Sequence, residues 1–558
     1  MGVKNAILKI VDELNVSNEQ ILVYGPLIHN PQTIEVLKQR GLITINSLNE
    51  IKNRQIAIRT HGIPVDENRL IRDEASRTIN LTCSRVARVQ SIIKKYSRSG
   101  YYTIIIGDHD HAEVIGLKSY AESGVTVVSD KNDINGIPTG MKYIVVSQTT
   151  HERREFEQIV EMITKKLRDV LIIDTICDST RLRQDDVTEG IKKGIDTLVV
   201  VGGKNSANTT RLAKIGTDNG IKTIHIETED ELLQKDFDGS KYILVTAGAS
   251  TPGWIINNVL EKLYSINNSR SSFLVKSFKQ CFEFLVRSNV VASIASFFMA
   301  LIAMQYAGYT PDLRYGAISF LYIFVMYSVN NYLDKNFLVK NNSYKYKIYK
   351  LYGKYLLLIS IIFCIFSLFI SFTINPVFVF VLCVPYLLGI IYSTSFFKSL
   401  IRALGSVTIE KIYNTKIITA FGWLVPVIML PYLQCDTTAF KIISLSLFYF
   451  SFVFLRQILF DLVAFQGDLI LGRETLPTWL GIRKSSIAAY ILAGLSIIVL
   501  AVSIVYHGIY SYFIILIPML VYIILLKRIG KTDYLISLRY EFIIDSNFIF
   551  FVILFLMA

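Results

Sequence analysis

The sequence predicts a two-part protein in which a soluble α/β domain precedes an all-α membrane domain. The 558 residues combine 52% hydrophobic with 18% charged residues, a balance untypical of a wholly soluble or a disordered chain. Residues 1–270 carry 35 Lys and Arg against 34 Asp and Glu, whereas residues 271–558 carry 23 against 11. Because membrane domains place basic residues in cytoplasmic loops, the excess favours a lipid bilayer as partner and argues against nucleic acid.

The α/β class of residues 1–265 follows from short β-branched runs that alternate with polar, helix-like stretches. Runs such as YYTIIIGD and TLVVVGG end in polar clusters. In open α/β folds the ligand crevice lies beyond the carboxyl ends of the strands, so we expect these clusters to line one pocket. The start, MGVKNAILKIVDELN, lacks the continuous apolar region of a signal peptide. We therefore expect this domain in the reducing cytoplasm, with free thiols.

The membrane class of residues 283–558 follows from apolar stretches that come after a polar linker at 266–282. By length we expect about nine bilayer-spanning helices. Basic residues gather in alternate loops, so the positive-inside rule predicts a multi-pass cell-membrane protein with a cytoplasmic N-terminal domain. The candidate spans are 284–307, 315–333, 351–372, 375–393, 415–433, 440–460, 486–507, 509–526 and 541–558.

Several polar residues in the first domain suit a polyanion. His29, His61 and His111 each follow an apolar run, and three histidines that meet in one crevice suit a diphosphate. Ser206, Asn208 and Ser250 lie near Gly-rich turns whose backbone N–H groups suit phosphate oxygens. Taken singly, Ser206, Asn208 and Ser250 are equally well explained as turn or capping residues, and a lone histidine after a strand is more often a structural residue.

Ordered motifs across residues 1–262 resemble the LytB/IspH family of 4-hydroxy-3-methylbut-2-enyl diphosphate reductases. The resemblance implies three α/β modules around a central cluster site, and products that are isopentenyl and dimethylallyl diphosphate. The motifs are HN at His29, THGIP around His61, TCSRV around Cys83, HAEV from His111, QTT around Thr149, TICDSTRLRQ around Cys177, VVVGGKNSANTTRL and VTAGASTP.

The resemblance also implies a [4Fe–4S] cluster held by three cysteines, two of which match Cys83 and Cys177. The family's first cysteine lies in a GFCxGV motif and would fall just before Met1; either the true start lies upstream or that ligand is lost. Glu113 matches the proton donor, and reduced ferredoxin or a flavodoxin-like protein is the implied electron donor. The implied substrate-binding residues are His29, His61, His111, Thr149, Ser206, Asn208 and Ser250, with His111 and Thr149 also in the proton-donor network.

Carboxylates at the cytoplasmic ends of spans indicate a second site. Asp334, Asp461 and Asp468 are suited to Mg²⁺, which binds through carboxylates and substrate phosphates. An interfacial anchor is the alternative for Asp334. For Arg456, diphosphate binding and snorkelling to the interface both remain open.

The segments around these carboxylates resemble the UbiA superfamily of intramembrane prenyltransferases. Asn330 and Asp334 match the start of its NxxxDxxxD motif, and GDLILGRETLP matches the region of the second motif. The resemblance implies Mg²⁺ held by Asn330, Asp334, Asp461 and Asp468 and ionisation of a prenyl diphosphate. Leu338 and Ala464 depart from the two motifs, and Asp461 lies one turn away as a substitute. Lys411 and Arg473 are expected to share the diphosphate.

The two resemblances together predict a bifunctional enzyme of isoprenoid metabolism that acts on isoprenoid diphosphates. Two alternatives stay open. The first keeps an active prenyltransferase and turns the reductase-like domain into a cluster-free diphosphate-binding module. The second is a non-enzymatic membrane sensor of isoprenoid diphosphates.

Overall fold

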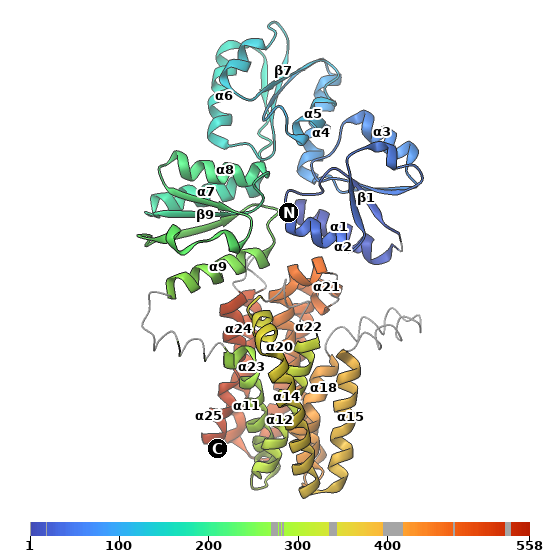
Figure 1. Ribbon diagram of the computed structural model, residues 1–558, viewed down its shortest axis with the longest axis vertical. Helices are drawn as coiled ribbons and strands as arrows, with labels where there is room; N and C mark the ends of the chain where they lie inside the picture. The colour runs from blue at the N-terminus through green and yellow to red at the C-terminus, as the bar shows by residue number, and fades with distance from the viewer. Residues whose placement is uncertain are drawn as a thin grey trace. The chain divides into compact units, whose positions relative to one another are not determined.

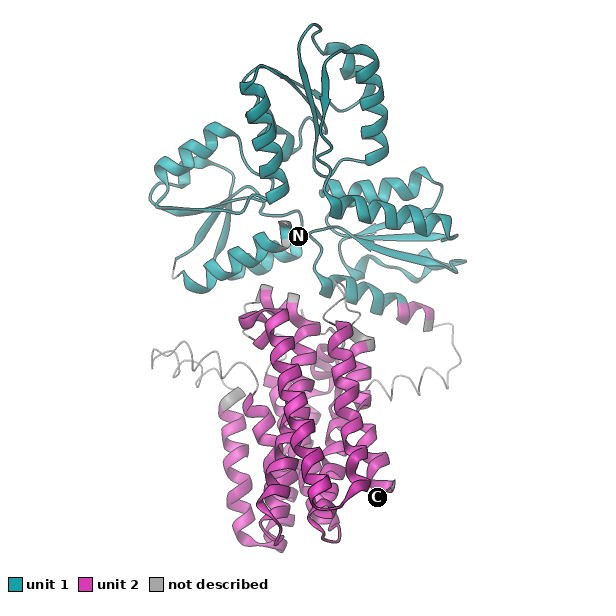
Figure 2. Cartoon of the chain, turned by 180° about the vertical axis from the view of Figure 1, so that it is seen from behind, with its two compact units in different colours: residues 1–263, 470–472 teal, residues 264–469, 473–558 magenta. Residues whose placement is uncertain are grey.

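The computed structural model describes residues 2–17, 19–268, 277, 281, 284–333, 343–393, 417–471, 475–529 and 537–557. The chain divides into two compact units (Figure 2): residues 1–263 with 470–472 form unit 1, and residues 264–469 with 473–558 form unit 2. Unit 1 combines strands and helices, whereas the described residues of unit 2 contain helices and no strand. Most of the expected linker at 266–282 lies outside the described residues.

In its described part, unit 1 contains three separate sheets in which all paired strands run parallel (Figure 1). Their strand orders are β2-β1-β3-β4, β6-β5-β7-β8 and β10-β9-β11. The predicted α/β class with three modules is therefore confirmed. The strands are β1 (Ile21–Tyr24), β2 (Leu42–Ile45), β3 (Gln55–Ile58), β4 (Arg77–Asn80), β5 (Tyr102–Ile106), β6 (Val125–Val128), β7 (Tyr143–Ser147), β8 (Val170–Ile172), β9 (Thr197–Val201), β10 (Lys222–Ile226) and β11 (Ile243–Ala247).

Helices cover these sheets because the central strands are apolar on both faces. Every residue of β7 and β9 is buried, as expected for parallel strands between two helical layers. One face of β5 and β7 packs on α6, and the other packs on α4 and α5. The helices are α1 (Gly2–Val16), α2 (Pro31–Gln39), α3 (Val65–Glu74), α4 (Ser84–Arg98), α5 (Ala112–Lys118), α6 (Arg153–Lys166), α7 (Asp178–Lys192), α8 (Ala207–Asp218) and α9 (Gly253–Asn268).

Unit 2 is helical, which confirms the predicted all-α class. Within its described residues, five helices are long and apolar enough to cross a membrane: 290–307, 348–374, 439–465, 482–506 and 510–529. Apolar helices at 376–391 and 417–432 are shorter, and the stretch expected to span at 541–558 consists of α24 (Ser537–Ser546) and α25 (Ile549–Met557). The expected count of about nine is therefore not confirmed.

The remaining helices of unit 2 surround one large apolar core. They are α11 (Val290–Ala307), α12 (Leu313–Leu333), α14 (Ser343–Ile374), α15 (Pro376–Ser393), α18 (Ile417–Leu424), α19 (Leu430–Tyr432), α20 (Ala439–Leu471), α21 (Leu476–Leu480), α22 (Ile482–Tyr506) and α23 (Ile517–Ile529). Helix α14 exposes Leu358, Ile362, Ile365, Phe366 and Phe369. Such an apolar outer face suits contact with lipid.

A π-helical segment, η5 (Val425–Met429), joins α18 to α19. In π geometry the Pro426 carbonyl would accept from the backbone nitrogen of Pro431, which carries no hydrogen. Ser319 Oγ on α12 donates to this carbonyl instead, at 2.8 Å. The side chain thus satisfies a backbone group that has no water to bind inside an apolar core and fixes α12 against η5.

Candidate functional site

Three histidines meet in unit 1, and we call them the histidine cluster: His29 after β1, His61 after β3 and His111 at the start of α5. Their ring centroids lie 4.9 Å (His29–His61), 5.4 Å (His61–His111) and 6.3 Å (His29–His111) apart. One ring nitrogen from each lies within 4.8 Å of the others, so the cluster has the donor set of a metal or an anion site. The structure therefore brings together residues that are far apart in the sequence.

Burial keeps these rings neutral. Burial lowers the pKa of His111 to about 4, and Asp108 opposes this shift. Burial, followed by the neighbouring His29 and His111, lowers the pKa of His61 well below its usual value. Burial and the Arg59 charge lower the pKa of His29 as well. A bound polyanion would reverse these shifts because it stabilises the protonated rings.

A buried carboxyl group lies next to the histidine cluster. Glu113, which is 1% exposed, lies in the first turn of α5, and its backbone N–H donates to Nδ1 of His111 at 3.1 Å. The Thr149 backbone N–H donates to Oε1 of Glu113 at 2.7 Å, and Thr149 Oγ1 donates to Oε2 at 2.9 Å. Burial outweighs these two hydrogen bonds and raises the pKa of Glu113 to about 7. The group can therefore hold and release a proton near neutral pH.

Residues of the third module add polar groups. Ser206 caps α8, and Asn208 lies in its first turn, where backbone N–H groups favour anions. Neither amide atom of the buried Asn208 has a hydrogen-bond partner among the described residues. A Cβ on Gly203 would lie 2.4 Å from the carbonyl oxygen of His29, so only glycine lets the two modules approach this closely. Ser250 follows β11. These groups are suited to phosphate oxygens.

The two cysteines of unit 1 each precede a helix. Cys83 caps α4 and Cys177 caps α7, and both are partly buried free thiols. Arg85 in α4 and Asp178 in α7 form an ion pair, which holds the two helix starts together. Two cysteine side chains at helix starts that an ion pair links suit two of the ligand positions of an iron–sulfur cluster.

Sequence reasoning missed an ion pair between modules. Arg211 on α8 donates from Nη2 to both carboxylate oxygens of Asp108, at 2.9 and 2.8 Å, and Arg211 is 8% exposed. His151, two residues after Thr149, is 2% exposed, and neither of its ring nitrogens has a hydrogen-bond partner among the described residues. Burial lowers its pKa to about 4. In the sequence, the only signal for the ion pair between Arg211 and Asp108 is the DHDH segment, which contains Asp108.

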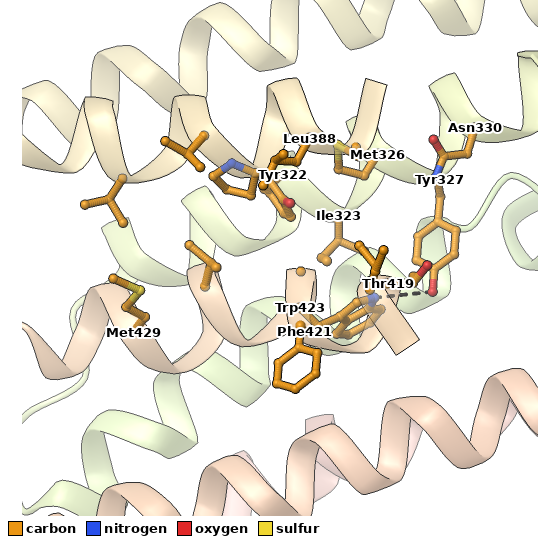
Figure 3. Close-up of a pocket in the computed structure, with 17 residues that line it drawn as sticks. Tyr322, Ile323, Met326, Tyr327, Asn330, Leu388, Thr419, Phe421, Trp423 and Met429 are labelled. Atoms are coloured by element: carbon orange, nitrogen blue, oxygen red, sulfur yellow. Dashed lines mark hydrogen bonds between the residues drawn. The ribbon is translucent and has the colours of Figure 1, made fainter. Parts of the chain in front are cut away.

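Unit 2 contains an apolar cavity of about 390 Å³, lined by α12, α15, α18 and η5 (Figure 3). Asn330, predicted from the first motif, lines the cavity near Tyr327. A cavity of this size with a few polar groups at one end is typical of a small-molecule site. Its walls include Tyr322, Ile323, Met326, Leu388, Phe421 and Trp423.

Two predicted carboxylates lie buried on one helix. Asp461 and Asp468 on α20 are each 2% exposed. Seven residues of helix place them on the same face, about 10 Å apart along the axis, so both cannot bind one ion directly. Asp334, Lys411 and Arg473, also predicted here, lie outside the described residues.

Arg456 does not snorkel, because the structure buries it. It is 3% exposed and forms an ion pair with Asp545 of α24, with Nε and Nη2 each 2.8 Å from Oδ1. Nη1 of Arg456 donates to the hydroxyl of Tyr327 at 3.1 Å. The sequence offered no reason to pair these residues, since 89 positions separate them.

Comparison with known proteins identifies the first unit. The family described as LytB protein matches residues 1–264. A 4-hydroxy-3-methylbut-2-enyl diphosphate reductase of Syntrophotalea carbinolica is 37% identical over 246 residues, which cover 44% of this chain and 88% of that protein. Through this unit, the chain belongs to the LytB family.

Solved structures resemble both parts of the chain. An (E)-4-hydroxy-3-methyl-but-2-enyl diphosphate reductase is 34% identical, with a TM-score of 0.38, and the match covers 48% of this chain and 95% of that one. A UbiA homolog from Archaeoglobus fulgidus, bound to GPP and Mg²⁺, is 13% identical, with a TM-score of 0.34, and the match covers 49% of this chain and 99% of that one. At 13% identity, the similarity to the UbiA homolog establishes no shared function.

Proposed function

We propose that unit 1 catalyses the reductive dehydroxylation of 4-hydroxy-3-methylbut-2-enyl diphosphate. The observation that carries this proposal is a carboxyl group with its pKa raised to about 7, placed next to three neutral histidines, together with an unpartnered amide at Asn208. The named activity of relatives that are more than a third identical supports it.

Each residue then has a defined task. The histidine cluster, Ser206 and Asn208 bind the diphosphate, and the anion charges the rings that burial had kept neutral. Glu113 holds a proton and delivers it to the hydroxyl oxygen of the substrate, which leaves as water. Thr149 orients the carboxyl group through both of its donors. Two electrons and a second proton complete the reduction to isopentenyl and dimethylallyl diphosphate.

Cys83 and Cys177 would hold the [4Fe–4S] cluster that the family implies. When bound, such a cluster supplies electrons and a Lewis-acidic iron. A reduced ferredoxin or flavodoxin-like protein is the proposed donor.

Iron and sulfide analysis, EPR and anaerobic turnover with an artificial reductant test this proposal on the full chain. Cys83→Ser and Cys177→Ser should each lower iron content and abolish turnover, whereas Cys281→Ser, which changes an exposed thiol, should change neither. Cluster-free wild-type protein that still binds inorganic diphosphate would instead support the diphosphate-binding module.

We propose as a second activity that unit 2 transfers a prenyl group from a prenyl diphosphate in a UbiA-like membrane domain. The supporting observation is that Asn330 lines an apolar cavity, while Asp461 and Asp468 are buried on one face of α20. The cavity suits an isoprenoid chain, and Asp461 and Asp468 would each hold a separate Mg²⁺ that binds the diphosphate. In bound form Mg²⁺ stabilises the leaving diphosphate. Asp334, Lys411 and Arg473 would complete this site.

Transfer of a radiolabelled prenyl group into membrane lipids tests the second activity. Asp468→Asn should abolish Mg²⁺-dependent transfer, whereas Asp436→Asn, a change in the loop after α19, should leave it intact. Equal transfer by both variants would contradict the assignment of Asp468 as a Mg²⁺ ligand. We further propose that the chain lies in the cell membrane with unit 1 in the cytoplasm, as the basic loops predict.

A further inference from the structure

One hydroxyl group at the cavity wall of unit 2 receives an unusual number of hydrogen bonds. Tyr327 lines the cavity, and its oxygen accepts from Nε2 of Gln457 at 2.9 Å, Nη1 of Arg456 at 3.1 Å and Nε1 of Trp423 at 3.3 Å. Figure 3 shows the contact with Trp423. Three N–H groups thus converge on one phenol oxygen.

None of these three donor groups can accept a hydrogen bond from the phenol O–H. Arg and Trp side chains carry no hydrogen-bond acceptor, and the amide of Gln457 presents its nitrogen. Among the residues that the structure describes, no acceptor for the Tyr327 proton is found.

Packing fixes the phenol in this orientation. The guanidinium carbon of Arg456 lies 5.4 Å from the ring centroid of Tyr327, and the Trp423 ring meets Tyr327 edge-on at 6.1 Å. Trp423 in turn stacks on Phe548 at 5.7 Å. Because three donors surround its oxygen and Tyr327 lines the cavity, the cavity is the place where a ligand could offer an acceptor to the O–H group.

We propose that Tyr327 is a specificity-determining residue: its O–H donates to an oxygen of the ligand and selects an isoprenoid whose polar end accepts a hydrogen bond. The apolar walls recognise the hydrocarbon body, and a donor left without an acceptor in an apolar cavity disfavours ligands that lack such an oxygen. The inference rests on the isoprenoid cavity of the proposed second activity and requires no prenyl transfer.

Two probes of the same chain length separate these contributions. Farnesyl methyl ether accepts a hydrogen bond but donates none, and farnesene does neither. Quenching of tryptophan fluorescence in the detergent-solubilised full chain reports binding, and Trp423→Phe shows which part of the signal arises at the cavity. Wild-type protein should prefer the ether about five-fold, as one net hydrogen bond predicts.

Tyr327→Phe should bind both probes with equal affinity, because it keeps the ring and removes only the hydroxyl. Tyr322→Phe is the matched control, since it removes another tyrosine hydroxyl at the same cavity and should keep the preference. A preference that survives in Tyr327→Phe and disappears in Tyr322→Phe overturns the proposal.

Equal binding of the two probes by wild-type protein also overturns it and would indicate that the amide of Gln457 is turned over to accept the phenol proton. Failure of wild-type protein to bind either probe overturns the isoprenoid cavity as well. The prenyl-transfer assay with Asp468→Asn is scored separately, so loss of transfer and loss of this selectivity are distinguishable.

Discussion

The proton affinity of Glu113 is set by a balance that one substitution can shift. Burial raises the pKa from 4.5 to about 7, while the Thr149 N–H and hydroxyl oppose the rise. Thr149→Val removes the hydroxyl donor at 2.9 Å and keeps the backbone donor at 2.7 Å. A hydrogen bond to a charged group contributes about 1.5–3 kcal/mol. Because the hydroxyl can also accept from the protonated acid, we expect the lower end, a further rise of about one pH unit.

Infrared difference titration measures this pKa directly. The carbonyl stretch of protonated Glu113 is isolated by subtracting spectra of Glu113→Gln, and the signal is followed against pH. Thr149→Ser keeps a hydroxyl donor and should titrate like wild type. Coincident titrations of Thr149→Val and wild type would refute the assignment of the hydroxyl as a donor to the carboxylate.

The same raised pKa predicts how stability changes with pH. The folded state binds the proton of Glu113 more tightly than the unfolded state, so its stabilisation is complete below about pH 4.5 and is lost as pH rises through about 7. The shift from 4.5 to about 7 corresponds to about 3 kcal/mol in the free energy of unfolding. Denaturant unfolding of Glu113→Gln should lack this component of the pH dependence.

Three further predictions concern other contacts. Binding of inorganic diphosphate at neutral pH should take up protons, because the anion charges the histidine cluster; calorimetry in buffers of different ionisation enthalpy measures the uptake, and its absence would contradict the anion site. Gly203→Ala should cost about 1–3 kcal/mol of stability in thermal unfolding, because its Cβ would meet the His29 carbonyl at 2.4 Å, whereas Gly136→Ala meets no atom within 4 Å and should be neutral. Asp545→Asn should destabilise unit 2 by about 3–5 kcal/mol by leaving a buried arginine charge unpaired, while the same change at Asp312, in a more exposed ion pair, should cost less than about 1 kcal/mol.

Local patterns in the sequence were sufficient for the two fold classes. Continuous β-branched runs such as TLVVV can be buried only between two helical layers, and β9 is buried throughout. Long apolar stretches predict helices in unit 2, because helices satisfy their own backbone groups in lipid. The number of spans was less well predicted, since the last apolar stretch divides into α24 and α25.

Motif order predicted the candidate residues of the site and the convergence of its histidines, but not the hydrogen-bond geometry. His29, His61 and His111 were expected to converge, and their ring nitrogens do lie within 4.8 Å of one another. The family resemblance placed Thr149 with Glu113, which lies 36 positions away, but no local pattern encodes the two hydrogen bonds that join them.

The sequence by itself determined the α/β and membrane-helical classes, the LytB motifs and the set of candidate ligands, because these depend on residue type and spacing along the chain. Only the tertiary structure decided the neutral state of the histidine cluster, the raised pKa of Glu113 and the three donors on Tyr327. Burial and hydrogen-bond geometry arise from contacts between distant segments. The Arg456–Asp545 ion pair is the clearest case, because desolvation makes each charge depend on a partner that the local sequence does not show.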